Sequence, residues 1–199
     1  MIRLFAAVAV PPDIGEGLVR RQAGIERAAR ELRLACAGEL REVRGIVKRR
    51  WEDCAGGLAE PLQVSGTLWG GNLAMLASLA GTPWMPQIQG GILFLEDVNE
   101  HPYRVERSLL QLHQAGVLDA QKAVLLGDFS GYRLSDYDNG YDFESMLSFI
   151  RSQVTVPLLQ GLQFGHVRDK LTLPVGAMAS LRSDAEGFTL EVSGYPLPR

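Results

Sequence analysis

An acid and a histidine in this sequence have the placement of two members of a hydrolytic triad. Glu96 is the first polar residue after the apolar run 92–95, so it should end a buried strand. His166 follows Gly165 in a loop between two further apolar runs. In a triad, a carboxylate fixes the imidazole tautomer while the imidazole takes the proton of the nucleophile. These two residues predict acid–base chemistry in which Glu96 orients His166.

Other residues compete for the same roles. Asp97 is the rival carboxylate, which strand alternation would direct to the opposite side from Glu96. The acidic run LEDVNE is also typical of a solvated loop. His101 precedes a proline in a loop, and His113 lies among leucines in an expected helix, where a structural or exposed role is the simpler interpretation.

A convincing nucleophile is missing. The string GDFSG places Ser130 in a context that superficially resembles the GxSxG elbow, but it lacks the spacing and the following helix pattern. A turn at the end of a strand is the preferred interpretation. Cys36 and Cys54 have no base near them in the sequence.

Composition excludes several classes of protein. With 199 residues, of which 46% are hydrophobic and 22% charged, the chain can form a proper core. A net charge of −3 and a pI near 5.7 argue against a nucleic-acid-binding protein, and no apolar run suits a membrane span. Two cysteines without a CxxC pattern favour reduced thiols and a cytoplasmic location. Without phosphate-binding, zinc-protease or calcium-loop motifs, we expect no cofactor and no metal.

The expected elements divide the chain into two regions and indicate an α/β (α+β) fold. Residues 1–55 form an atypical segment, with a strand over 2–10 and helices over 14–34 and 39–54. Residues 56–199 begin with a linker over 56–61 and then form the main domain. In that domain we expect helices over 73–80, 103–115 and 142–153, and strands over 62–69, 92–95, 123–129, 171–173, 177–182 and 188–193.

Four strings in this main domain carry a family resemblance: SGTLWGGNLAMLASLAGTP, GGILFLEDVNEHPYRVERSLLQL, VLLGDFSGYRL and GLQFGHVRDKLTLPVGA. In order and spacing they resemble the C-terminal half of the LD-carboxypeptidases, the group of murein tetrapeptide carboxypeptidases and microcin C immunity peptidases. The resemblance runs from about residue 62 to the end, whereas the first fifty residues or so do not match.

The resemblance implies a β-rich swivelling β/β/α-type domain and a serine-type peptidase. Such enzymes use a Ser-Glu-His triad to remove the terminal D-alanine from L,D-linked murein tetrapeptides during cell-wall recycling. It assigns the acid to Glu96 and the base to His166. The family's serine lies in a GxSD-like turn of another domain, which residues 1–50 do not contain. We therefore expect impaired activity, with a non-catalytic muropeptide-binding or interaction remnant as the alternative.

Two residues are candidates for substrate contact. Arg168, beside the histidine, could meet a terminal carboxylate. Asn72, in the GGN turn, could face the cleft, although a structural role in the turn is equally open. The expected partners are a muropeptide and either a second copy of the chain or a nucleophile-bearing chain, with no nucleic acid and no membrane.

Overall fold

A computed structural model describes residues 45–50, 61–168 and 170–193. The chain forms two compact units, residues 1–43 and 44–199, and all described residues belong to the second. This unit contains a seven-stranded sheet with the strand order β1-β7-β6-β2-β3-β4-β5. The strand expected over 2–10 and the helix expected over 14–34 lie outside the described residues.

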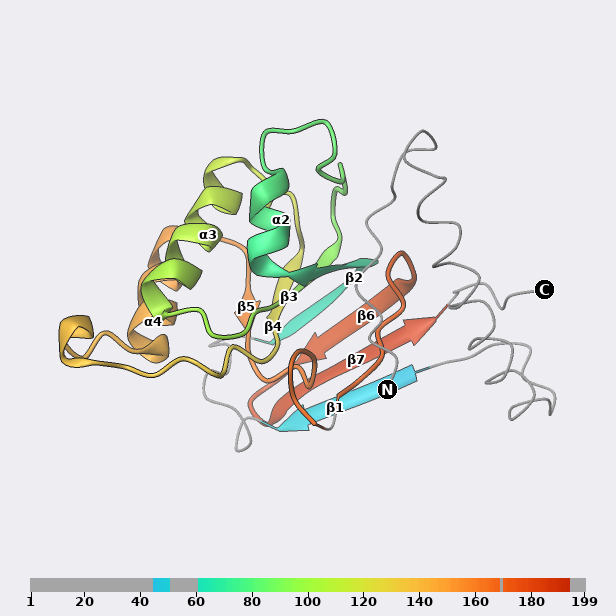
Figure 1. Ribbon diagram of the computed structural model, residues 1–199. Coiled ribbons are helices and arrows are strands. Elements are labelled where there is room, and N and C mark those ends of the chain that lie inside the picture. The colour runs from blue at the N-terminus through green and yellow to red at the C-terminus, as the bar shows by residue number, and fades with distance from the viewer. Residues whose placement is uncertain (1–44, 51–60, 169, 194–199) are drawn as a thin grey trace, which may run out of the picture. The chain divides into compact units, whose positions relative to one another are not determined.

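One half of the sheet is parallel and carries the helices (Figure 1). Parallel strands need crossover connections, and helices supply them here. The alternating elements are β2 (Leu62–Asn72), α2 (Leu73–Leu79), β3 (Ile92–Glu96), α3 (Pro102–Gln114), β4 (Ala123–Leu126), α4 (Phe143–Gln153) and β5 (Leu158–Leu159). The carboxyl ends of β2, β3 and β4 consequently lie at one edge, where sites form in such sheets.

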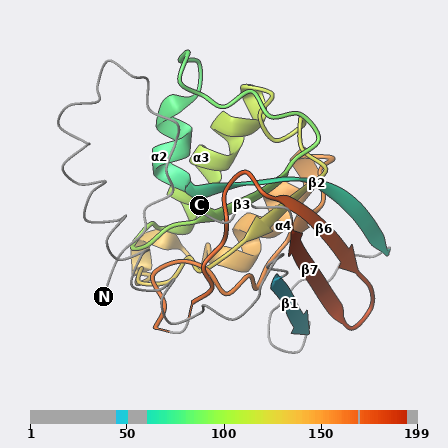
Figure 2. The same ribbon diagram turned by 90° about the vertical axis from the view of Figure 1, so that its right-hand side faces the viewer.

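The other half of the sheet is antiparallel and consists of β6 (Met178–Ser183), β7 (Gly187–Ser193) and β1 (Gly45–Arg50). The long strand β2 joins the two halves. Its residues 62–67 pair antiparallel with β6, and its residues 68–72 pair parallel with β3. Figure 2 shows β6 and β7 continuing from β2 away from the helices.

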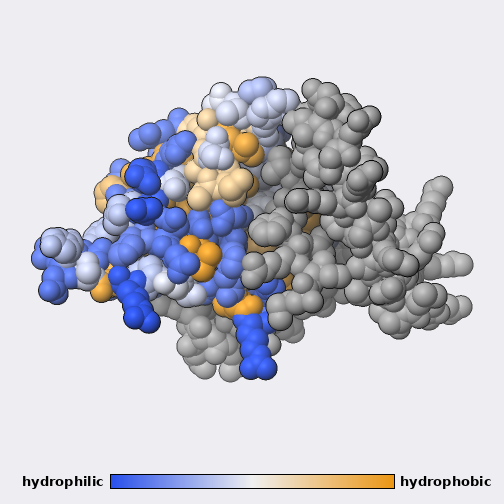
Figure 3. Space-filling view, viewed as in Figure 1, coloured by the Kyte–Doolittle hydropathy of each residue, from blue (hydrophilic) through white to orange (hydrophobic). Residues whose placement is uncertain are grey.

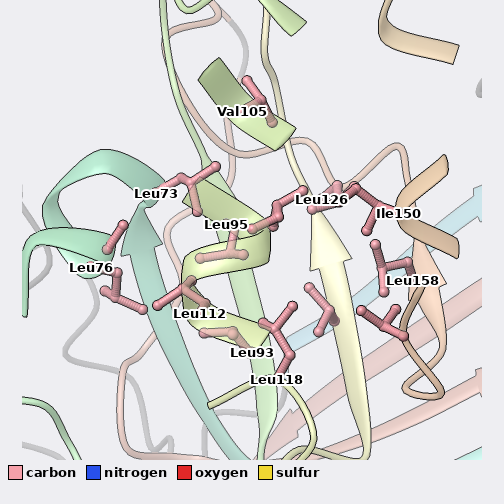
Figure 4. Close-up of a cluster of buried hydrophobic side chains, with 14 of the residues drawn as sticks. Leu73, Leu76, Leu93, Leu95, Val105, Leu112, Leu118, Leu126, Ile150 and Leu158 are labelled. Carbon is pink, nitrogen blue, oxygen red and sulfur yellow. The ribbon is translucent and has the colours of Figure 1, made fainter. Parts of the chain in front are cut away.

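Apolar side chains cover both faces of the central strands. In β3, Leu93 and Leu95 pack with the helices, as Figure 4 shows for this cluster. Ile92 and Phe94 face the other way and pack with residues of β6 and β7. Burial on both faces explains why β3 reads as a continuous apolar run. Packing on both faces also holds β3, the strand that carries Glu96, in place.

The surface shown in Figure 3 is largely hydrophilic, with hydrophobic colour gathered around α2. Met75 of α2 is among the exposed apolar side chains. Among the described residues, no helix has the length and apolar character needed to cross a membrane.

The mixed α/β class is confirmed, two element predictions need correction, and one strand was not predicted. Residues 45–50 form strand β1, where we expected part of a helix over 39–54. Their β-branched pair Ile46–Val47 favours a strand, and β7 offers a free edge for pairing. Residues 171–173 form no strand, and in the described part of the chain the Leu171 N–H donates to the Gln163 carbonyl of the preceding loop instead of to a strand. The two-residue strand β5 was not predicted, since it is too short to show a periodicity.

Candidate active site

Two neighbouring strand ends place Asn72 beside Glu96. These residues are register partners at the carboxyl ends of β2 and β3. Alternation along β3 sends Glu96 to the side of Ile92 and Phe94, away from the helices. Glu96 thus emerges at the sheet edge with its side chain only 8% exposed.

The loop that carries His166 is held against the end of β4. Leu162 N–H donates to the Leu126 carbonyl, and Asp128 N–H donates to the Phe164 carbonyl. The Phe164 ring packs edge-on against Phe94, with 4.9 Å between ring centroids. These contacts bring the loop to the carboxyl end of β3.

His166 and Glu96 meet at this edge. The Nδ1 atom of His166 lies 3.0 Å from Oε2 of Glu96. A carboxylate only accepts hydrogen bonds, so Nδ1 carries the proton and Nε2 of the neutral ring is left as an acceptor. The imidazole is 39% exposed, so it is accessible to a group arriving from solvent. This arrangement can orient a general base.

Gly165 permits the close approach. Its φ of +131° lies in the region that favours glycine. A Cβ on this residue would lie 3.0 Å from Cβ of Asp128 and 3.3 Å from both Cβ and Oε2 of Glu96. The lack of a side chain therefore lets the histidine loop lie against the acid.

Asp97 does not compete with Glu96 for the histidine. Its side chain is buried and faces α2, where Oδ2 accepts from Ala74 N–H at 2.9 Å. Its Oδ1 accepts from Val98 N–H and from Nδ2 of Asn72, both at 2.9 Å. Consecutive positions at the strand end thus give the two carboxylates different partners, His166 for Glu96 and the start of α2 for Asp97.

Asn72 joins both carboxylates. Its Nδ2 lies 3.4 Å from Oε1 of Glu96, and its Oδ1 accepts from Met75 N–H as the N-cap of α2. The Asn72 side chain therefore has the structural role in the turn that was one of the two interpretations of the sequence. It also contacts Glu96. Its contact with a substrate stays a prediction.

Arg168 lies apart from the pair. It is exposed and lines an open pocket of about 430 Å³ together with Asp128, Gln163 and Phe164. Among the described residues, it makes no hydrogen bond to Glu96 or His166. Arg168 follows His166 by two residues, and its contact with a substrate stays a prediction.

The other candidates are engaged elsewhere. Ser130 donates its hydroxyl to Asp128, His101 pairs with Asp138, and His113 pairs with Asp119. Within the described ranges, no serine makes a hydrogen bond to His166. The same residues include no cluster of three or more His, Cys, Asp or Glu side chains suited to a metal.

The joint role of Asn72 and Asp97 is not apparent from the sequence. A weak indication existed, because Asn directly before a helical run is typical of an N-cap. Nothing in the sequence placed Asp97 at the start of that helix, since this depends on the pairing of β2 with β3.

Comparisons with known proteins identify the family of this domain. Residues 65–181 match the family model described as the LD-carboxypeptidase C-terminal domain. A crystal structure of muramoyltetrapeptide carboxypeptidase from Oxalobacter formigenes is 56% identical, with a TM-score of 0.71, over 77% of this chain and 51% of that chain. A probable murein peptide carboxypeptidase of Bacillus subtilis is 31% identical over 66% of this chain and 41% of its own length. The murein tetrapeptide carboxypeptidase of Pseudomonas aeruginosa is 36% identical over 61% of this chain and 39% of its own length.

The chain thus spans about half or less of the length of these relatives. The matched part contains both Glu96 and His166.

Proposed function

The chain belongs to the LD-carboxypeptidase family by its C-terminal domain, and we propose that it is the acid–base half of a serine-type carboxypeptidase. The substrate class is an L,D-linked murein tetrapeptide, from which the terminal D-alanine is released during cell-wall recycling. The single observation that carries the proposal is the 3.0 Å contact between Nδ1 of His166 and the buried Glu96 carboxylate.

In this reaction Glu96 holds the imidazole so that Nε2 faces the reacting groups. Nε2 takes the proton of a serine hydroxyl as the serine oxygen attacks the scissile carbonyl. The imidazolium then returns the proton to the amino group of the departing D-alanine. Water hydrolyses the acyl-enzyme by the same steps, so Glu96 and His166 act in both halves of the reaction.

The sequence contains no serine outside the described residues, and no described serine bonds His166, so the proposal requires another polypeptide to supply the nucleophile. Removing the serine of a triad costs about 10⁶-fold in turnover, because the acid and base alone provide little catalysis. We therefore expect the isolated chain to be weakly active or inactive. We propose that its macromolecular partner is a second copy of the chain or a nucleophile-bearing polypeptide. The proposed location is the cytoplasm.

Release of D-alanine from an L,D-tetrapeptide tests the proposal. The wild-type chain should release little, and His166→Ala and Glu96→Gln should abolish what it releases. His113→Ala is the matched control, because its imidazole also contacts a carboxylate, that of Asp119, but one on the surface. Robust release by the wild-type chain that His166→Ala abolishes would disprove the expected impairment. Release that survives both Glu96→Gln and His166→Ala would refute the assigned roles.

A non-catalytic muropeptide-binding or interaction module is the alternative, favoured by the lack of a serine bonded to His166 in the described part of the chain. Isothermal titration with a muropeptide separates the two. A peptidase site should lose affinity in at least one of Glu96→Gln and His166→Ala. A module that binds elsewhere should keep its affinity in both.

A further inference from the structure

We infer that Asp97 is a positioning residue, which acts through Asn72 on Glu96 and thereby sets the orientation of His166. The inference rests on the proposed function and extends it to a carboxylate that takes no part in the proton transfer. Asp97 is 6% exposed, and among the described residues no Lys, Arg or His forms an ion pair with it. A buried carboxylate needs partners, and here backbone and amide N–H groups provide them.

Asp97 is fixed by the backbone on either side of the site. Ala74 N–H lies in the first turn of α2, and Val98 N–H follows the end of β3. Both bonds are 2.9 Å long, and the start of a helix also favours a negative charge. Asp97 therefore joins α2 to β3 rigidly and offers Oδ1 at a fixed point.

That fixed oxygen determines how Asn72 is turned. Nδ2 of Asn72 lies between Oδ1 of Asp97 and Oε1 of Glu96, while Oδ1 of Asn72 faces Met75 N–H. Rotating the amide by half a turn would place its oxygen against two carboxylates and its NH₂ group against an N–H donor. Only the observed orientation satisfies all three contacts.

Asn72 in turn determines which oxygen of Glu96 faces His166. Oε1 faces Asn72 at 3.4 Å, which leaves Oε2 for His166 at 3.0 Å. The last torsion of a glutamate is otherwise broad, so a donor on one oxygen restricts where the other points. The hydrogen-bonded series Asp97–Asn72–Glu96–His166 therefore links the backbone of α2 and β3 to the proposed base.

The tautomer of His166 provides a test that does not require a working nucleophile. Imidazole ¹⁵N spectra of the full chain, at about pH 8 where an ordinary histidine is neutral, distinguish Nδ1–H from Nε2–H. Wild type should show His166 as Nδ1–H. In Asp97→Asn, either amide orientation places NH₂ against a backbone N–H, so the side chain at position 97 is no longer held by both Ala74 and Val98, and its contact with Asn72 weakens. The Nδ1–H to Nε2–H ratio should fall roughly two- to fivefold, the effect of weakening one hydrogen bond.

A second variant covers the case in which Asp97→Asn does not fold. Asn72→Ser keeps an N-cap oxygen for α2 but removes the amide that reaches Glu96. It should shift the tautomer in the same direction. Asp142→Asn is the matched control, because Asp142 also accepts a backbone N–H at the start of a helix, α4, but contacts Ser145. It should leave His166 unchanged.

The outcomes are distinct. If wild-type His166 is Nδ1–H and stays so in folded Asp97→Asn and Asn72→Ser, the positioning role is wrong while the Glu96–His166 pair stands. If wild-type His166 is not Nδ1–H, the pair itself fails, and the proposed function loses its support together with this inference.

Discussion

Gly165 lies directly against Glu96, although the two residues belong to different parts of the sequence. A Cβ at position 165 would come within 3.3 Å of both Cβ and Oε2 of Glu96. The oxygen concerned is the one that faces His166. The spacing of the acid and the base therefore depends on a position without a side chain.

Replacing Gly165 by alanine should separate the pair. The φ of +131° alone should cost about 1 to 3 kcal/mol of unfolding free energy, and the contact with Asp128 and Glu96 should add to it. Urea unfolding measures the loss, and the tautomer of His166 reports the displaced loop. Gly176→Ala is the control, with φ +89° and no atom within 4 Å of the added Cβ. An equal loss in both variants, with an unchanged tautomer, would show that the contact has no effect.

The predictable part of this site follows from local pattern. A four-residue apolar run that ends in an acid indicated β3 and Glu96, because burial on both faces of the strand removes polar residues from it. The pairing of strands is not local. The register of β2 and β3 places Asn72 beside Glu96, and no periodic pattern in the sequence indicates that register. The same is true of the contact between Phe164 and Phe94.

The same limit explains why a helix was wrongly expected at residues 45–50. Its charged residues suit a helix, but the free edge of β7 stabilises residues 45–50 as a strand. Tertiary pairing overrides local propensity in such cases. The Asp97 contacts depend on tertiary pairing in the same way, since they join the start of α2 to the end of β3, which the pairing of β2 with β3 brings together.

Tyr141 should make the stability of the protein sensitive to alkali. Burial and the hydrogen bond that its hydroxyl donates to Glu106 raise its pKa from 10.0 to about 12. A raised pKa in the folded state gives stability that is complete below pH 10 and is lost as the pH rises toward about 12. Urea unfolding across this range should show a steeper loss for wild type than for Tyr141→Phe. Tyr137→Phe, at a fully exposed position, should retain the steep loss.

Asp142 should have the opposite effect in acid. The Ser145 hydroxyl and backbone N–H both donate to it and lower its pKa below 3.8. A lowered pKa gives stability that is present above pH 3.8 and is lost as the pH falls through the folded-state value. Unfolding curves from about pH 5 to about pH 2 should fall less steeply for Asp142→Asn, which keeps an N-cap without a titrating group. Glu191→Gln on the exposed side of β7 should behave as wild type, and a wild-type slope in Asp142→Asn would contradict the assignment.

Phe94→Leu should loosen the loop that carries Phe164 and His166. Phe94 is fully buried, and its ring supports Phe164, whose carbonyl accepts from Asp128 N–H. The variant keeps an apolar side chain but loses an edge-to-face pair worth about 0.5 to 1.5 kcal/mol beyond its buried area. Stability should fall by at least that amount, and His166 should show a lower proportion of Nδ1–H.

The matched control for this variant is Phe129→Leu. Phe129 pairs with Phe143 at 5.3 Å and belongs to the cluster on the helix side of the sheet. It should lose comparable stability without a change in the His166 tautomer, because its ring contacts the opposite face from Phe164. If both variants changed the tautomer equally, general destabilisation would explain the result. A change confined to Phe94→Leu would identify the Phe94–Phe164 contact as the support that holds His166 within reach of Glu96.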